Sequence, residues 1–195
     1  MRSWDALPDA ILEPAGDVTG AFFGVGVRDY RAAARHLNHL PYGRNSSRTE
    51  TLAVLREEHG TCSTKHALLM ELALEQKLDV ALVIGIYEMT ARNTPGVGSV
   101  LARHGLAYVP EAHCYLRYRE DRVDVTRALA DGPSEPIVRF LHEEEISPPQ
   151  VGNYKIGLHQ SFIRKWIAEN PDDAGGRSFD EIWRIREECI AALSG

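Results

Sequence analysis

The sequence has few cysteines, three among 195 residues, and no long uncharged apolar run. Three cysteines are too few for a disulfide scaffold, and a chain of this size buries a full core without crosslinks. We therefore expect reduced thiols and a cytoplasmic location. A membrane-spanning helix needs roughly 18 consecutive apolar residues. Because no stretch approaches this length and acidic residues interrupt the N-terminal apolar positions, we expect neither a membrane span nor a signal peptide.

The charge balance excludes a further group of functions. The chain has 22 basic and 28 acidic residues and a net charge of −6. A mildly acidic chain has no general attraction for nucleic acid or for an anionic membrane. The apolar fraction of 44% is ordinary for a globular protein. We expect one domain over residues 1–195, with no indication of its oligomeric state.

The apolar pattern predicts helices at both ends of the chain and strands between them. We predict an irregular N-terminal region over 1–27, with a short strand near 21–27. Apolar residues at helical spacing predict helices over 29–40, 49–59, 62–76, 154–169 and 178–193. Segments that are β-branched or alternate in polarity predict strands over 79–87, 113–118 and 122–126. The order of helices, antiparallel strands and helices indicates the α+β class.

Cys62 follows Gly60 and Thr61 and directly precedes the predicted long helix. The N-terminus of a helix presents unpaired backbone N–H groups and a positive dipole end. Both favour a thiolate and lower the pKa of a cysteine at this position. The same N–H groups can bind an oxyanion that develops on an attacked carbonyl. The position is equally compatible with a small buried residue that begins the helix.

His113 and Asp124 lie on the two strands of a predicted hairpin. Alternation places His113 and Cys114 on opposite faces, so we interpret Cys114 as a core residue and His113 as facing a cleft or solvent. Asp124 stands between two valines, where a carboxylate is costly to bury without a partner. A nucleophile, a base and a carboxylate therefore follow one another as Cys62, His113 and Asp124.

Two registers of this hairpin remain open. A turn centred between residues 119 and 120 pairs residue 118 with 121 and 115 with 124. Asp124 is then the diagonal neighbour of His113, about 7–8 Å away between Cα atoms, and its carboxylate reaches the Nδ1–H group. A turn one residue later separates the two by about 13 Å, which is too far. A Cys-His-Asp triad therefore predicts the first register.

The residues of this hairpin and of the cysteine region resemble a known family. Gly60-Thr61-Cys62-Ser63, with a long apolar helix behind it, is similar to the nucleophile region of the transglutaminase-like superfamily. Residues 113–118 and 123–126 resemble the His strand and the Asp-x-Thr strand of that superfamily. The resemblance spans residues 40–127. It implies a papain-like fold in which the nucleophile helix packs on an antiparallel sheet, with additional C-terminal helices.

The resemblance also implies a reaction. The family includes cross-linking acyl transferases, peptidases and amidases, and some members have lost catalysis. Several transglutaminases have Trp after the nucleophile where this chain has Ser63, and no calcium-loop pattern is present, so the resemblance does not extend to metal-regulated cross-linking. It implies acyl transfer or hydrolysis at an amide or peptide bond through a thioester. The alternative is a catalytically silent papain-like module that binds a peptide or protein.

We expect neither a cofactor nor a bound metal. His59, Cys62 and His66 have ligand-like spacing, and His113 with Cys114 would complete a zinc set. However, Gly60 breaks the first helix after His59, and adjacent strand residues point to opposite faces. We interpret His66 as a supporting or helix-surface residue. No complete Gly-x-Gly-x-x-Gly or phosphate-binding loop is present, so the glycines near 24 and 96 are interpreted as turn residues.

Three further segments have open roles. Tyr42 or Asn45 could supply a second oxyanion donor and Arg44 could bind a substrate carboxylate, although a helix-terminating loop is slightly favoured. The segment 92–105 is a candidate lid over the cleft. The acidic run 143–145 is interpreted as a solvated face, and the two C-terminal helices as core cover or an oligomer interface.

Overall fold

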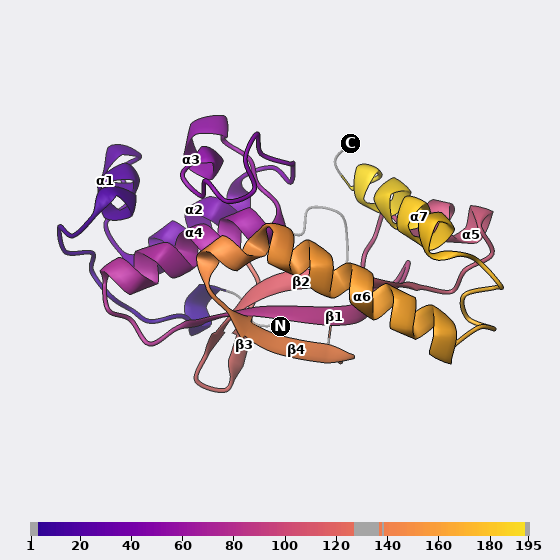
Figure 1. Ribbon diagram of the computed structural model, residues 1–195. Helices are drawn as coiled ribbons and strands as arrows, with labels where there is room; N and C mark the ends of the chain where they lie inside the picture. Colours follow the sequence, from indigo (N-terminus) through magenta and orange to yellow (C-terminus); the bar gives the residue numbers. More distant parts are fainter. Residues whose placement is uncertain (1–3, 127–136, 138, 194–195) are drawn as a thin grey trace. The chain divides into compact units, whose positions relative to one another are not determined.

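The computed structural model describes residues 4–126, 137 and 139–193 (Figure 1). The fold is mixed α+β, with a four-stranded sheet in the order β3-β2-β1-β4. The chain divides into two compact units. Unit 1 comprises residues 1–84, 113–128 and 143–152, and unit 2 comprises residues 85–112, 129–142 and 153–195. No helix within the described ranges is both long and apolar enough to cross a membrane.

Unit 1 is built around one long buried helix, α4 (Cys62–Glu75). Helix α2 (Tyr30–His39) packs against α4 (Figure 1), and the buried hydroxyl of Tyr30 donates to the carbonyl of Leu69 at 3.0 Å. Asp29 caps α2 by accepting from the N–H of Ala32 at 2.7 Å. The remaining helical elements are short: η1 (Trp4–Ala6), α1 (Asp17–Gly24), α3 (Ala53–Glu57) and η2 (Pro148–Val151).

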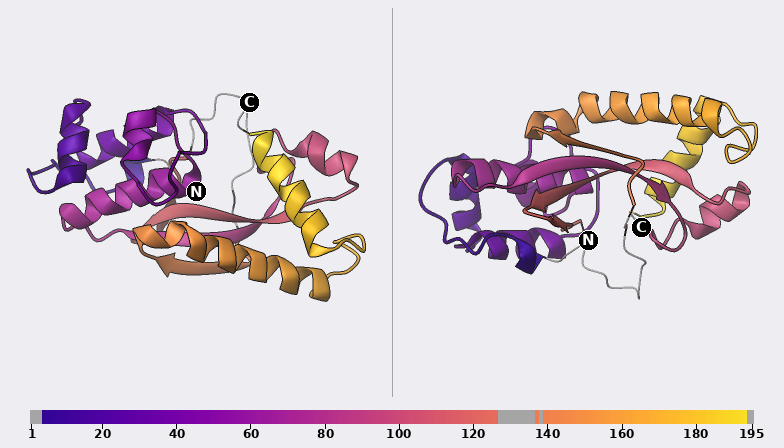
Figure 2. Two further views of the ribbon diagram at one scale, coloured as in Figure 1. Left: turned by 45° about the horizontal axis from the view of Figure 1, so that its top comes forward. Right: turned by 90° about the horizontal axis from the view of Figure 1, so that it is seen from below.

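Unit 2 contains three helices, α5 (Gly98–Arg103), α6 (Asn153–Glu169) and α7 (Phe179–Ala191). Helix α7 lies beside both α5 and α6 (Figure 2). The predictions of helices over 154–169 and 178–193 are therefore confirmed. Ser178 begins α7 with a capping box, in which its hydroxyl and the Glu181 side chain satisfy each other's backbone N–H groups.

The strands are β1 (Ala81–Met89), β2 (Val109–Tyr118), β3 (Asp121–Val123) and β4 (His142–Ile146). Strands β2 and β3 are antiparallel, and Tyr118 pairs with Asp121. This is the first of the two registers considered from the sequence. Arg119, in the two-residue turn, has a φ of 54°, in the left-handed region that tight hairpin turns require.

The prediction of a short strand near residues 21–27 is wrong, because residues 17–24 form helix α1. Its N-cap residue Gly16 has no capping side chain. Glu75, at the far end of α4, supplies the cap instead. Its carboxylate accepts from the backbone N–H groups of Val18 at 3.0 Å and Thr19 at 2.7 Å, and from the Thr19 hydroxyl at 2.6 Å. Because the capping residue lies 56 residues away in the sequence, no sequence pattern near residue 17 predicts the start of α1.

The structure also bears on the segments with open roles. Residues 92–105 contain α5, and Val97, Val100 and Leu101 are buried in the core of unit 2, which opposes a lid role. The acidic run belongs to β4, and two of its residues, Glu143 and Glu145, are exposed and form ion pairs with arginines. Glu143 binds Arg122, and Glu145 binds Arg117.

The Glu75 cap yields a first prediction. Glu75→Ala removes the acceptor of three donors at the start of α1, so we expect the free energy of unfolding to fall by about 1–2 kcal/mol, as for loss of an N-cap side chain. Urea unfolding of the full chain measures this. Glu169→Ala, which removes an exposed pair with Lys165 at 3.8 Å, is the control and should cost about 0.5 kcal/mol or less. Equal midpoints for the two variants would contradict the capping role.

Unit 2 contains a buried ion pair that the sequence did not suggest. Arg186 on α7 donates from Nε and Nη2 to the two carboxylate oxygens of Glu111 on β2, both at 2.6 Å. His159 on α6 lies beside this pair and bonds through Nε2 to the carbonyl of Pro110 at 2.9 Å. Burial would raise the pKa of Glu111, but the nearby positive charges of Arg186 and its neighbours lower it to about 2.

We therefore predict a large cost for breaking this pair. Arg186→Met strands the Glu111 carboxylate in the core, which should destabilise the chain by about 3–5 kcal/mol at pH 7. The pair stabilises the fold above the ordinary carboxyl pKa of about 4.3, and this contribution is lost as the pH falls towards 2. The difference between the variant and the wild type should therefore shrink between pH 5 and pH 3 in urea titrations. A constant difference across this range would be inconsistent with the pair.

Candidate active site

The N-terminus of α4 positions the predicted nucleophile. Cys62 is the first residue of the helix and is 7% exposed. Thr61 and Thr64 form a capping box, in which the Thr64 hydroxyl accepts from the Thr61 N–H at 3.0 Å and the Thr61 hydroxyl accepts from the Thr64 N–H at 3.3 Å. At Gly60, a Cβ atom would lie 2.9 Å from the Lys65 side chain, so only glycine fits this approach.

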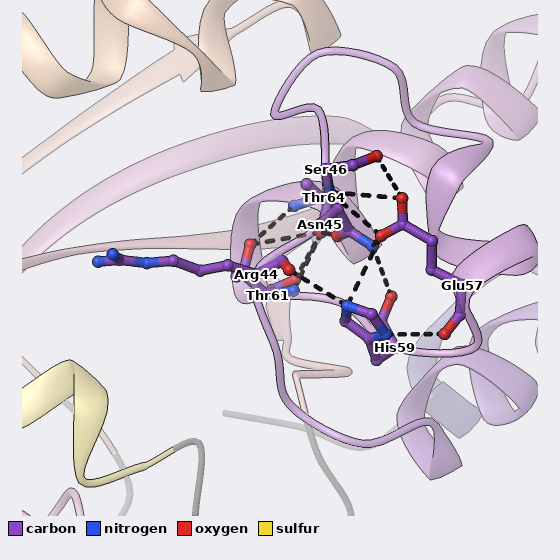
Figure 3. A network of polar contacts seen from close by, with 7 residues as sticks. All are labelled: Arg44, Asn45, Ser46, Glu57, His59, Thr61 and Thr64. Carbon is purple, nitrogen blue, oxygen red and sulfur yellow. Dashed lines mark hydrogen bonds and ion pairs between the residues drawn. The ribbon is translucent and has the colours of Figure 1, made fainter.

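A network of hydrogen bonds connects the loop 42–47 to the N-terminus of α4 (Figure 3). The amide of Asn45 donates to Glu57 at 3.0 Å and to the carbonyl of His59 at 2.9 Å, and its oxygen accepts from the Thr64 hydroxyl at 2.7 Å. Both amide protons of Asn45 are thus engaged, which opposes an oxyanion role. The Arg44 side chain extends away from the network (Figure 3).

His113 and Asp124 meet directly. The Nε2 atom of His113 lies 2.9 Å from Oδ2 of Asp124. The contact uses Nε2 rather than the Nδ1 atom expected from the sequence. The other oxygen, Oδ1, accepts from the N–H of Thr126 at 2.8 Å and from its hydroxyl at 2.5 Å. Asp124 lies just beyond the end of β3, so the return strand is shorter than predicted and the carboxylate is held by a turn.

The electrostatics of this pair depend on the cysteine. Burial disfavours the imidazolium of His113, but the charge of Asp124 and the charge and hydrogen bond of Cys62 outweigh it. The pKa of His113 therefore lies well above its ordinary value. Burial also acts to raise the pKa of Asp124, yet the charge and hydrogen bond of His113 hold it far below the ordinary value. The arrangement favours an imidazolium at His113 beside the ionised carboxylate of Asp124.

His66 is a further buried member of the cluster. Its Nε2 atom accepts from the backbone N–H of Val125 at 2.9 Å, so its proton resides on Nδ1, which donates to the carbonyl of Cys62 at 2.7 Å. Burial lowers the pKa of His66 to about 4, despite the nearby Asp124. His66 is therefore neutral near pH 7. It is fully buried, so the helix-surface interpretation is wrong.

Lys65, the preceding residue, is fully buried as well. Its ammonium donates to the carbonyls of Leu40 at 2.6 Å and Thr126 at 2.7 Å. Burial lowers the pKa of Lys65 to about 8, although the charges of Asp124 and Cys62 oppose this shift. A buried lysine that retains its charge needs such partners.

The other two cysteines have different environments. Cys114 is fully buried, and its sulfur lies 3.7 Å from the hydroxyl of Ser63, which in turn lies 3.9 Å from the sulfur of Cys62. Cys189 is buried in the core of unit 2, and burial raises its pKa to about 11. None of the three cysteines forms a disulfide bond. The zinc set considered from the sequence has no counterpart here, since no metal-binding group of three or more His, Cys, Asp or Glu occurs in the described part of the chain.

The structure thus brings His113 and Asp124 into direct contact, agrees with the supporting role considered for His66, and adds Lys65, which sequence reasoning missed. The sequence contains a pattern that indicates the burial of Lys65 and His66. They lie three and four residues after Cys62, on the same helical stripe as Leu69, Leu72 and Ala73, all of which are buried. Charged or polar residues in line with core leucines indicate buried polar contacts. Their partners in segment 124–126 had no such signal.

Comparisons with protein-family models, with curated proteins and with solved structures give no match to this chain. The interpretation of the site therefore depends on its own geometry and on general chemistry.

The network around Asn45 gives a prediction for this site. Asn45→Ala leaves the Thr64 hydroxyl and the His59 carbonyl without their partner, so we expect a loss of about 2 kcal/mol in urea unfolding. Asn45→Asp keeps the acceptor for Thr64 but places a second carboxylate beside Glu57, and it should also destabilise. An unchanged unfolding midpoint in both variants would contradict the anchoring role.

Proposed function

We propose that this protein is a cysteine-dependent acyl-transfer enzyme with a papain-like, transglutaminase-like fold, acting on an amide or peptide bond. The observation that carries the proposal is the His113 imidazole, which lies 2.9 Å from the Asp124 carboxylate and has its pKa raised by the charges of Asp124 and of Cys62, the first residue of helix α4. The sequence resemblance at residues 60–63, 113–118 and 123–126 supports the same assignment. Cysteines that form no disulfide bond fit a cytoplasmic enzyme.

In the proposed mechanism each group has a role. Because Asp124 occupies Nε2 of His113, Nδ1 is the atom that takes the proton from the Cys62 thiol. The thiolate attacks the carbonyl carbon, and the backbone N–H of Cys62 stabilises the oxyanion. When the tetrahedral adduct collapses, the C–N bond breaks and His113 protonates the leaving amine. The acyl group remains on sulfur as a thioester, which water or an amine then resolves.

Asp124 has a supporting role in this scheme. As a carboxylate it fixes the orientation of the imidazole and stabilises the imidazolium. Its own orientation comes from the Thr126 backbone and hydroxyl. The substrate is a peptide, a protein or a small amide.

The test is the pH dependence of Cys62 alkylation by iodoacetamide. A thiol with an ordinary pKa reacts tenfold faster for each pH unit between 5.5 and 7.5, because its thiolate fraction rises tenfold. A thiolate already formed beside an imidazolium reacts at a nearly constant rate over the same range. The slope is more informative than the absolute rate, because a low-pKa thiolate is also a weaker nucleophile.

We expect a flat profile for the wild-type chain and a slope near one for His113→Ala, because the variant lacks the cation that stabilises the thiolate. Peptide mass spectrometry separates Cys62 from Cys114 and Cys189, which serve as internal controls. Asp124→Asn should give an intermediate slope. A slope near one in the wild type would refute the enzyme and favour a silent module that binds a peptide or protein.

A further inference from the structure

Two adjacent residues of α4 hold the backbone that carries Asp124. The imidazole of His66 accepts from the N–H of Val125 at 2.9 Å, and the ammonium of Lys65 donates to the carbonyl of Thr126 at 2.7 Å. Both side chains are fully buried. Consecutive residues of one helix turn thus bind consecutive residues of the segment 124–126.

These bonds determine where the Asp124 carboxylate points. Oδ1 is engaged by the backbone and hydroxyl of Thr126, and Oδ2 faces His113. Once the backbone of 125 and 126 is held, little freedom remains for the carboxylate. The position of His113 relative to Asp124 therefore depends on the bonds made by Lys65 and His66.

His66 also reaches the nucleophile. Its Nδ1–H donates to the carbonyl of Cys62 at 2.7 Å, while its Nε2 holds Val125. A rigid aromatic ring thereby links the backbone at Cys62 to the backbone next to Asp124. The ring packs edge-on to His113, with centroids 6.2 Å apart.

The charges in the cluster are complementary. The charges of Asp124 and Cys62 act on Lys65, and those of Asp124 and His113 act on His66. With a thiolate and an imidazolium, Cys62 and Asp124 contribute two negative charges, and His113 and Lys65 contribute two positive charges. Neutral His66 adds none. Removal of Lys65 would leave the buried cluster with an uncompensated negative charge.

We propose that Lys65 and His66 form a positioning clamp that holds the segment 124–126 against the N-terminus of α4 and so aligns Asp124, His113 and Cys62. Only the effect of this clamp on catalysis rests on the proposed function. Neither residue touches the reacting atoms, and both act through Asp124 and the Cys62 backbone.

The first test uses the wild-type chain. Long-range ¹⁵N NMR should find His66 neutral, with its proton on Nδ1, from pH 8 down to about pH 5. A proton on Nε2 would overturn the clamp, because Nε2 could not then accept from Val125. This measurement needs no variant and does not depend on catalysis.

The second test separates the two bonds of His66. In His66→Gln the side-chain amide oxygen lies near the position of Nε2, so an acceptor for the N–H of Val125 is retained. In His66→Asn the shorter amide reaches only the position of Nδ1, so the bond to the Cys62 carbonyl can form but the bond to Val125 is lost. We expect His66→Asn to lower the pKa of His113, measured by NMR, by about one unit, a tenfold change in its proton affinity. His66→Gln should remain within about 0.3 units of the wild type.

His39→Asn is the matched control, because His39 makes the same bond from Nδ1 to the carbonyl four residues earlier, at 2.7 Å, but lies exposed on α2. It should leave the pKa of His113 unchanged. If His66 only fills space, both His66 variants will lose stability alike without shifting the pKa of His113, and the clamp is refuted.

Lys65→Met provides an independent variant, with Lys165→Met on the exposed face of α6 as its control. We expect amide hydrogen exchange at Val125 to accelerate at least about tenfold in Lys65→Met only, since loss of the Thr126 anchor frees the segment. Equal exchange in both variants would overturn the role of Lys65. If wild-type Cys62 alkylates with a slope near one, the proposed function fails while these NMR and exchange measurements still decide the clamp.

Discussion

The hydrogen bond between the Val125 N–H and the His66 imidazole joins two parts of unit 1 that are 59 residues apart in the sequence. This bond also determines which nitrogen of His66 carries the proton. Because Nε2 of His66 must accept, Nδ1 must donate, and the carbonyl of Cys62 is the acceptor within reach. One protonation state of one buried ring thus orients the start of α4 and the turn that contains Asp124.

Near the N-terminus of α4, polar and charged side chains are buried at positions where a protein core is usually apolar. Lys65 and His66 are fully buried, and Asp124 and His113 form a direct ion pair beside them. Burial of such groups is costly unless each finds a partner. In the described residues, every buried side-chain nitrogen and oxygen has a hydrogen-bond partner. At the other end of α4, Glu75 caps helix α1. Polar contacts therefore connect α4 to neighbouring segments at both of its ends.

Much of the secondary structure was predictable because its signals are local. Helical periodicity located α2, α4, α6 and α7, and β-branched residues located β1. The hairpin register followed from requiring one carboxylate to reach one imidazole, and Tyr118 does pair with Asp121. Helix α1 was missed because its cap is the distant Glu75. The segment 49–59 forms the much shorter helix α3, Ala53–Glu57, whose last turn is followed by Glu58 in a left-handed conformation.

For the site, the sequence by itself determined the candidate triad: a cysteine at a helix start and a histidine and an aspartate on a hairpin. These follow from capping, alternation and turn length, which act over a few residues. Only the tertiary structure decided which imidazole nitrogen meets Asp124, that Asn45 is an anchor, and that Lys65 and His66 bind the segment 124–126. The physical reason is that each depends on hydrogen bonds between residues that only folding brings together, and such pairs have no periodicity along the chain.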